Sequence, residues 1–576
     1  MRKLHPIQTT GDLGLRIVRV LLVGVVIGVA ASLLAFGLIA LVSLGSEWIG
    51  LLKNRYPPLV AAMITVGTPA LGGLLVGLIV HRMSERRPHN PADVILAAQS
   101  NLKLTSLKIR DGIYNYIASI VSLVSGASVG QYGPIVNMGA TLAVNLRRWV
   151  RADATVLIGC GVAAAISAAF NAPIAGIVFA HEAILRHFSL RAFAPITIAA
   201  SAAFYVSTFI FDSEHLFQTE FMQILYLGEF AAFTLVGILA GLLAVLFLHS
   251  ILYARLLSSR IALNQKFRPM IAGLMVGILA LEVPEILGIG DNVMRQTLYA
   301  ESLSALHIGE ILLAKFVASA LCLGFGFAGG VFSPALLIGV LFGSLFGLSI
   351  DLFMPHSNIA VYAVCGMAAV TSPIIGAPLT TILIIFELTH SYELTTAVMI
   401  SVVFSNMVSY RLFGRSLFDF QLKSRGFDLS QGRDPLILST MTIANIARRA
   451  CTRLKPGSNI PHAIEQLVAD EVSEAYVVDE HQHFIGRVTL AALLAHGDSR
   501  QALMEVESLV DPHSLRFHPG TSIWDAMHDI KGYVGESIPI VDRDNGTLVG
   551  IIHESDLIRA YMQSAHELRS EETANA

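Results

Sequence analysis

Two short segments of the sequence, GQYGP at 130–134 and GVFSP at 330–334, decide how this chain folds. Both read glycine, any residue, aromatic residue, small residue, proline, and Gly139 and Gly339 continue the same register. Glycine and proline interrupt an apolar helix, and proline is well placed in the first turn of the next helix. Each segment therefore predicts a break followed by a short helix that starts at Pro134 or Pro334.

The self-similarity continues downstream at a constant offset of 205 positions. GVAA at 161–164 matches GMAA at 366–369, and NAPI at 171–174 matches GAPL at 376–379. Glu182 and Glu387 follow the second pair of blocks at the same offset. Four blocks in the same order indicate two duplicated halves.

The composition is that of a membrane protein with a soluble tail. Of 576 residues, 54% are hydrophobic and only 14% are charged, whereas an average soluble domain is about 25% charged. This balance excludes a disordered chain, a nucleic-acid-coating protein and an ordinary cytosolic enzyme. From residue 437 on, the chain holds 20 of its 42 acidic but only 11 of its 39 basic residues. An apolar, slightly basic body therefore precedes an acidic tail.

Long windows without Asp, Glu, Lys or Arg mark the membrane segments: 20–46, 56–81, 112–146, 154–181, 316–350 and 352–386. A helix needs about 20 apolar residues to cross a bilayer, so the longest windows hold more than one segment. Because lipid does not tolerate unpaired backbone groups, the glycine–proline breaks predict helices that stop partway and line a cavity. The GxxxG spacing of Gly24 and Gly28 is interpreted as incidental in such a glycine-rich chain.

The duplicated breaks also predict the sign of a ligand. A helix N-terminus presents free N–H groups and a partial positive charge of about half a unit. Two such ends, converging from two halves near the middle of the membrane, make an anion site without lysine or arginine. Such a site releases its anion readily, as conduction requires. One such motif would be better explained as a tight turn between helices, but the repeated pair favours the site.

These residues resemble the CLC family of chloride channels and chloride/proton exchangers, from about residue 20 to 422. The segment 312–334 is similar to the family's K…GxGxxGGxFxP pattern, and 366–389 to its GMAA…APLT…FELT pattern. The stretch PEILGIG at 284–290 fits its P..LG.G pattern. The resemblance implies an all-α polytopic homodimer, in which each subunit has its own anion pathway between inverted halves, about 20–212 and 229–422.

The resemblance also implies the site residues. The backbone amides of Val331 and Phe332 would line the central anion site, and those of Gln131, Tyr132 and Gly133 its outer side. No catalytic residue is implied, and an HExxH metalloprotease motif after His181 would need a histidine where Leu185 stands.

Three positions depart from the family's pattern. Tyr132 stands at the place of the gating glutamate of GREGP, Pro88 at that of the serine of the inner GSGIP motif, and Phe418 at that of the central tyrosine. The inner proton-transfer glutamate is matched by Glu182. Because Glu387 is its counterpart in the other half, an acid at that position is also explained as a structural cap.

These departures decide the expected mechanism. A glutamate, with a reference pKa of about 4.3, can compete with an anion and carry a proton, whereas a phenol of pKa about 10 stays neutral. We therefore expect passive, channel-like conduction of chloride or another small monovalent anion. A proton-coupled chloride or nitrate antiporter of the same family is the alternative. A divalent-cation transporter would need clustered carboxylates, and a membrane-anchored sensor without transport is the remaining alternative.

The tail contains two similar units. Strands are expected at 475–479 and 484–489, then at 538–542 and 548–552, with helices before them at 460–468 and 522–531. This pattern resembles a tandem pair of CBS modules. The nucleotide signature of such pairs, Gly-x-x-Thr/Ser-x-x-Asp, is incomplete in both units, which have Thr489 without the aspartate and Asp556 without the hydroxyl. We expect an assembly role and no required cofactor, with Thr489 and Asp556 as the contacts for any adenine nucleotide.

The resulting organisation is a cytoplasmic segment 1–19, a transport domain 20–422, a linker 423–440, CBS units at 441–502 and 503–565, and a flexible end 566–576. The expected partners are a small anion, membrane lipid and a second copy of the chain, and nucleic acid is not expected. Bases predominate before residue 20, which favours a cytoplasmic N-terminus. The resemblance implies a location in the cell (inner) membrane, with the CBS tail in the cytoplasm.

Overall fold

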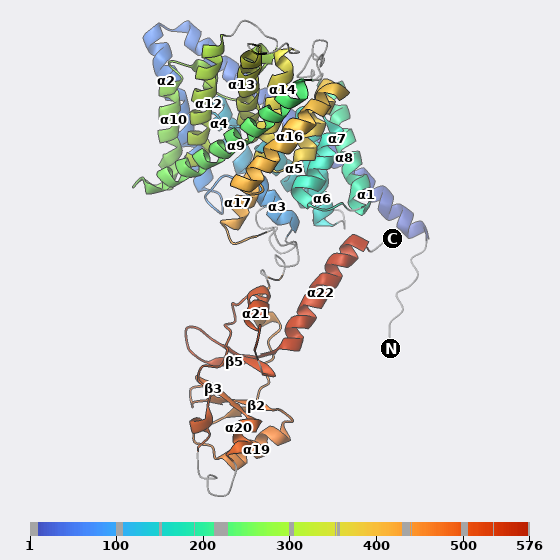
Figure 1. The fold of residues 1–576 in the computed structure, drawn as a ribbon, viewed down its shortest axis with the longest axis vertical. Helices are drawn as coiled ribbons and strands as arrows, with labels where there is room; N and C mark the ends of the chain where they lie inside the picture. The colour runs from blue at the N-terminus through green and yellow to red at the C-terminus, as the bar shows by residue number, and fades with distance from the viewer. Residues whose placement is uncertain are drawn as a thin grey trace. The chain divides into compact units, whose positions relative to one another are not determined.

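The computed structural model describes residues 10–99, 107–148, 153–188, 190–211, 228–298, 304–351, 353, 358–428, 438, 441–496, 505–533 and 535–573. The chain divides into two compact units, Met1–Gly426 and Phe427–Ala576. The first is built from helices and the second from short strands and helices (Figure 1). We describe each unit by itself.

The first half of the membrane unit consists of helices that follow the apolar windows. They are α1 (Thr10–Arg55), α2 (Pro58–His81), α3 (Pro91–Gln99), α4 (Ile109–Val124), α5 (Tyr132–Asn145), α6 (Ala154–Phe170), α7 (Pro173–Phe179), the π-helix η3 (Ala180–Leu185) and α8 (Leu190–Phe209).

The second half repeats this succession of long and broken helices. It comprises α9 (Glu229–Arg260), α10 (Arg268–Leu279), α11 (Asp291–Leu298), α12 (Ala305–Phe325), α13 (Phe332–Ile350), α14 (Ile359–Ile375), α15 (Pro378–Thr389), α16 (Tyr392–Leu412) and α17 (Leu417–Lys423). Within the described residues, seven helices are long and apolar enough to cross a membrane. The all-α polytopic fold is confirmed.

The helices after the two glycine–proline segments begin earlier than the sequence predicts. Helix α5 starts at Tyr132 and α13 at Phe332, each two residues before the proline expected to start it. Pro134 and Pro334 therefore occupy the third helical position. Proline is tolerated there because the N–H groups of a first turn have no partner within the helix.

Two glycine pairs explain why the repeats preserve glycine. A β-carbon on Gly139 would lie 2.5 Å from the carbonyl oxygen of Gly161, and one on Gly339 would lie 2.6 Å from that of Gly366. Helices α5 and α6, and equally α13 and α14, therefore cross with their backbones in contact. No side chain fits at either crossing, so both halves use the same close contact between two helix backbones.

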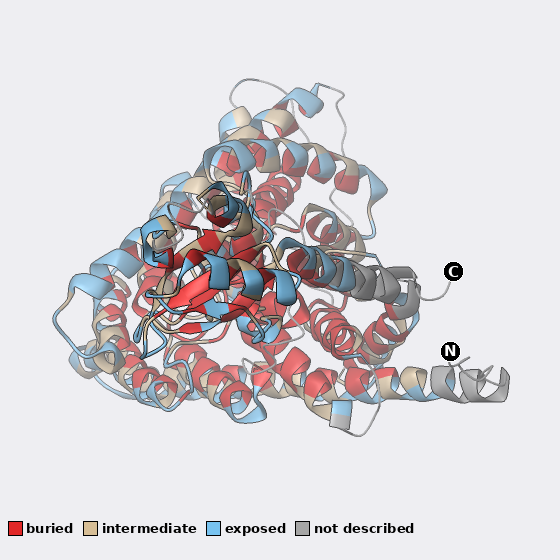
Figure 2. Ribbon diagram, turned by 90° about the horizontal axis from the view of Figure 1, so that it is seen from below, coloured by how far each residue is buried: buried red, intermediate tan, exposed pale blue. Residues whose placement is uncertain are grey.

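The GxxxG spacing in α1 has a structural role, and its interpretation as incidental is wrong. A β-carbon on Gly24 would lie 2.9 Å from the carbonyl oxygen of Pro195, and one on Gly28 2.5 Å from that of Ala199. The two glycines thus allow α1 to pack closely against α8. Figure 2 shows the buried residues on the inward turns of the membrane helices and the exposed ones on the outward turns.

The tail contains the strands and helices expected of two CBS-like units. The first unit has β1 (Arg453–Leu454), α19 (Ile460–Ala469), β2 (Glu474–Val478), β3 (Phe484–Thr489) and α20 (Leu490–Ala495); the second has α21 (Ile523–Asp529), β4 (Ser537–Val541), β5 (Leu548–His553) and α22 (Glu554–Thr573). The sheets have the orders β1-β2-β3 and β4-β5, and both hairpins are antiparallel. An apolar cluster of Tyr476, Val478, Val541, Leu548 and Ile551 joins the two units.

Candidate functional site

The two halves of the membrane unit meet at equivalent residues of the repeat. Gly130 donates its N–H to the carbonyl of Gly330 at 2.7 Å, and Gly330 donates to Gly130 at 2.6 Å. This antiparallel bridge places the breaks before α5 and α13 side by side. The internal duplication read from the sequence is thus a contact in space, at the point where both helices begin.

The N-termini of α5 and α13 have no side-chain cap. Gln131 and Val331 occupy the N-cap positions, neither helix has a capping hydrogen bond, and neither has an acidic residue in its first turn. Both first turns are buried. A buried helix end without a cap leaves N–H donors and a partial positive charge unmatched, and an anion is the ligand that satisfies both.

Most of the predicted anion-site residues surround one small cavity of about 20 Å³. Tyr132 and Gly133 reach it from α5, Val331 and Phe332 from the start of α13, and Phe418 from α17. Its volume is about that of one water-sized probe. Gln131 is buried beside these residues but is not part of the cavity lining.

Aromatic rings enclose Tyr132. Its ring stacks on Phe170 with centroids 3.9 Å apart and meets Phe332 edge-on at 5.3 Å. Phe170 in turn contacts Phe332 at 5.1 Å. The side chain at the gating position is thus a packed aromatic plug, only 6% exposed.

A larger cavity of about 330 Å³, here called the tail-side vestibule, adjoins the small one. Pro88 and Phe418 both line it, and Gly330, Val331 and Phe418 line both cavities. It lies beside α17, from which the chain leaves the membrane unit at Gly426. Pro88 and Phe418 present no hydroxyl group to either cavity.

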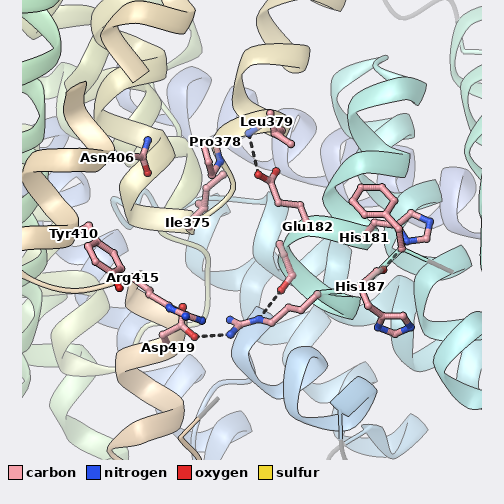
Figure 3. Close-up of a pocket in the computed structure, with 14 residues that line it drawn as sticks. His181, Glu182, His187, Ile375, Pro378, Leu379, Asn406, Tyr410, Arg415 and Asp419 are labelled. Atoms are coloured by element: carbon pink, nitrogen blue, oxygen red, sulfur yellow. Dashed lines mark hydrogen bonds and ion pairs between the residues drawn. The ribbon is translucent and has the colours of Figure 1, made fainter. Parts of the chain in front are cut away.

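Glu182 lies apart from these cavities and caps a helix of the other half. Its carboxylate accepts a hydrogen bond from the N–H of Leu379 at 3.0 Å (Figure 3). It also accepts hydrogen bonds from the N–H and the hydroxyl of Thr380 at 2.8 and 2.7 Å. These donors form the first turn of α15. The carboxylate thereby matches the partial charge of that helix end.

Glu387 forms the reciprocal cap. It accepts hydrogen bonds from the N–H groups of Ile174 and Ala175 at 2.9 and 2.7 Å, in the first turn of α7. Each half thus supplies the carboxylate that caps the other half's short helix. The starts of α7 and α15 are therefore filled by the protein itself, whereas those of α5 and α13 are not.

Glu182 also borders a third cavity of about 370 Å³, drawn in Figure 3. Arg186 and Asp419 form an ion pair at 2.7 Å across it. Ile375 lines both this cavity and the small central one. Ile375 is therefore the residue that borders both the surroundings of Glu182 and the central cavity.

The two candidate nucleotide contacts in the tail already have partners. The Thr489 hydroxyl accepts a hydrogen bond from the N–H of Ala492 at 3.2 Å and caps α20. Asp556 pairs with Arg448 at 2.7 Å. Although burial opposes it, the hydrogen bond from Arg448 lowers the pKa of Asp556 below its usual value.

Sequence reasoning missed Phe170 and Ile375, the central side chains that the two halves contribute from equivalent positions. Both end a helix directly before the repeated Ala-Pro block, 205 positions apart. The repeat therefore contained a signal for them. The aromatic contacts of Phe170 depend on its side-chain direction, which the pattern does not specify.

Duplicated halves that meet at broken helices, with uncapped N-termini at a central cavity, define a membrane transport protein for anions. The sequence profile described as "Voltage gated chloride channel" matches residues 72–410, and that of the CBS domain matches 506–563. The chain belongs to this CLC family, whose members transport anions as channels or as exchangers with protons.

Known relatives and solved structures agree with this assignment. The chain is 30% identical over 421 residues to the voltage-gated ClC-type chloride channel ClcB of Escherichia coli O17:K52:H18, covering 69% of this chain and 98% of the relative. A slow cyanobacterial Cl⁻/H⁺ antiporter shares the fold at TM-score 0.65 and 22% identity, over 73% of this chain and 99% of that one. A eukaryotic CLC transporter does so at TM-score 0.64 and 20% identity, over 94% and 98%.

Proposed function

We propose that this protein conducts chloride passively, without coupling to protons, through the small central cavity between its halves. The observation that carries this proposal is the enclosure of Tyr132, at the position of the family's gating glutamate, by Phe170 and Phe332. A phenol with a reference pKa of about 10 does not exchange protons near neutral pH, whereas a glutamate does.

The contacts of Glu182 support the same proposal. Glu182 accepts three hydrogen bonds at a helix N-terminus, and its movement would leave the first turn of α15 without a cap. Glu387 has the equivalent contacts in the other half. A structural role explains both acids, and proton transfer by Glu182 is the alternative to be tested.

The decisive experiment uses purified protein in liposomes with an outward chloride gradient and a pH-sensitive dye inside. We expect chloride efflux, measured with an electrode, without uphill proton movement once the membrane potential is clamped by valinomycin and potassium. Robust uphill proton transport would establish the exchanger instead. Chloride, nitrate and fluoride should be compared, since a solved relative in fold is a CLC-type fluoride/proton antiporter.

The tail is proposed to support assembly of a homodimer in the cell membrane, with the tail in the cytoplasm. The partners of Thr489 and Asp556 within the tail favour this role over nucleotide binding. Calorimetry of the full-length protein with ATP and AMP tests this part. Saturable heat that disappears in Asp556→Ala would assign a nucleotide site to the CBS pair.

A further inference from the structure

The tail-side vestibule is strongly basic. Four arginines line it, Arg87, Arg255, Arg268 and Arg425, and none of its lining residues is acidic. They come from different parts of the membrane unit: α9 and α10 supply two, and the segment before α3 and the end after α17 supply the others. A cavity walled by one sign of charge concentrates ions of the opposite sign.

Two of these arginines are held by acids behind the wall. Arg87 pairs with Asp93 at 2.6 Å and also with Glu85, and Arg425 pairs with Asp93 at 2.8 Å. The side chain of Asp93 is only 1% exposed, so this carboxylate holds the two arginines in place and is not itself presented to the cavity. The negative charges of Asp93 and Glu85 thus offset two of the four positive charges of the arginines.

The other two arginines leave a net charge of about two facing the vestibule. Within the described part of the chain, Arg255 and Arg268 have no ion-pair partner, and Nε of Arg268 is buried without a hydrogen-bond partner. Both ring nitrogens of His89, which also lines the vestibule, are likewise buried without a hydrogen-bond partner in the described part of the chain. Buried polar groups without partners call for an explanation, and an ion or water in the cavity supplies one.

The size of the vestibule selects a ligand larger than the transported ion. Its volume of about 330 Å³ falls within the range of small-molecule pockets. The adjoining central cavity, at about 20 Å³, holds only one water-sized probe. A tetrahedral oxyanion accepted by the vestibule is therefore too large to continue, and it would cover the entrance at Gly330, Val331 and Phe418.

The chemistry of the wall selects a phosphate. A guanidinium group binds phosphate oxygens in a bidentate fork, and a phosphate monoester carries a charge of about −1.5 to −2 at pH 7. That charge matches the two positive charges left by Arg255 and Arg268. A monovalent anion gains about half as much from the same field, so it is not retained.

We propose that the tail-side vestibule binds a small phosphate-bearing dianion, which blocks the anion pathway from that side. The proposal rests on the proposed function, because a block needs an open pathway to act on. It gives the protein an inhibitor site in the membrane unit, independent of the CBS pair.

The test measures chloride current through the full-length protein in a planar bilayer. Inorganic phosphate or glycerol phosphate is added to one chamber at a time, at constant ionic strength. We expect block from one side only. In Arg255→Gln/Arg268→Gln, half-block should need at least about tenfold more phosphate, whereas Arg260→Gln, at the exposed end of α9 and outside the vestibule lining, should match the wild type.

The controls separate the two proposals. Each single variant, Arg255→Gln and Arg268→Gln, is measured as well, in case the double variant is not folded by size-exclusion chromatography. An absence of block from both sides, or equal block in folded variants, overturns the inference. Absence of chloride current in the wild type overturns the proposed function instead. Loss of block in Asp556→Ala would place the phosphate site in the tail and also overturn the inference.

Discussion

Replacement of Tyr132 by alanine should accelerate anion flux. The ring lines the central cavity and contacts two others, with centroids 3.9 Å from Phe170 and 5.3 Å from Phe332. If the ring must move aside for each anion to pass, that movement breaks both aromatic contacts. Tyr132→Ala removes the need for the movement.

The expected size of the effect follows from those contacts. Each aromatic pair contributes about 0.5–1.5 kcal/mol beyond its buried area, so moving the ring costs about 1–3 kcal/mol. Removing a barrier of that height raises a rate about 5- to 150-fold. The same truncation leaves a space in the core and should destabilise the fold by about 3–5 kcal/mol, since large aromatic residues are costly to truncate.

Chloride efflux from liposomes, normalised to the amount of folded protein, measures the effect. Tyr132→Phe is the matched control, because it keeps both ring contacts and loses only the hydroxyl group. Its flux should stay within about twofold of the wild type if the ring acts as a plug. Flux in folded Tyr132→Ala that is equal to or below the wild type would refute the plug. A large loss of flux in Tyr132→Phe would identify the hydroxyl as an anion ligand.

Three further substitutions test the rest of the interpretation. Gly130→Ala places a β-carbon 2.9 Å from the carbonyl oxygen of Gly330 and strains the bridge between the halves. The free energy of unfolding should therefore fall by about 1–3 kcal/mol, which lowers the melting temperature measured by size-exclusion chromatography after heating. An unchanged melting temperature would count against the bridge. Glu182→Gln removes a charge from a helix N-terminus, so the free energy of unfolding should fall by about 0.5–2 kcal/mol. Chloride flux should persist in this variant. A change in proton movement would contradict the structural role of Glu182. Burial opposes ionisation of Asp556, but the hydrogen bond from Arg448 lowers its pKa, so the pair stabilises the tail fully above the unfolded pKa of about 3.9 and this contribution is lost as pH falls through the lower folded value. Arg448→Ala should therefore lower the melting temperature of the tail at pH 7, and the difference from the wild type should shrink as the pH is taken below about 3.9; a difference that does not depend on pH would contradict this role of the pair.

The amino-acid sequence alone predicted that the membrane unit consists of two duplicated halves of apolar helices with breaks at equivalent positions. Charge-free windows report membrane segments directly, because a charged side chain is costly in lipid. The glycine pairs that the repeat preserves, Gly139 with Gly161 and Gly339 with Gly366, reflect crossings where no side chain fits. A packing restraint of that kind is visible as a residue type at a fixed spacing. The helix starts were predicted two residues late, because proline is compatible with several positions of a first turn.

The strands of the tail were predictable for a similar reason. Short apolar runs containing β-branched residues, separated by polar turns, marked β2 through β5 to within about one residue. The roles of Thr489 and Asp556 were not, because their partners Ala492 and Arg448 are chosen by the local fold. The type of a residue shows which bonds it can make, but not which it does make.

The same distinction applies at the centre of the membrane unit. Glu182 and Glu387 were visible as equivalent acids, but which helix each one caps depends on how the two halves face one another. The aromatic packing of Tyr132 likewise depends on Phe170, 38 positions away in sequence. A break in a helix depends on the residues at that position, so it can be predicted from the sequence. Contacts between halves depend on side-chain directions after packing, and these exist only once the chain has folded.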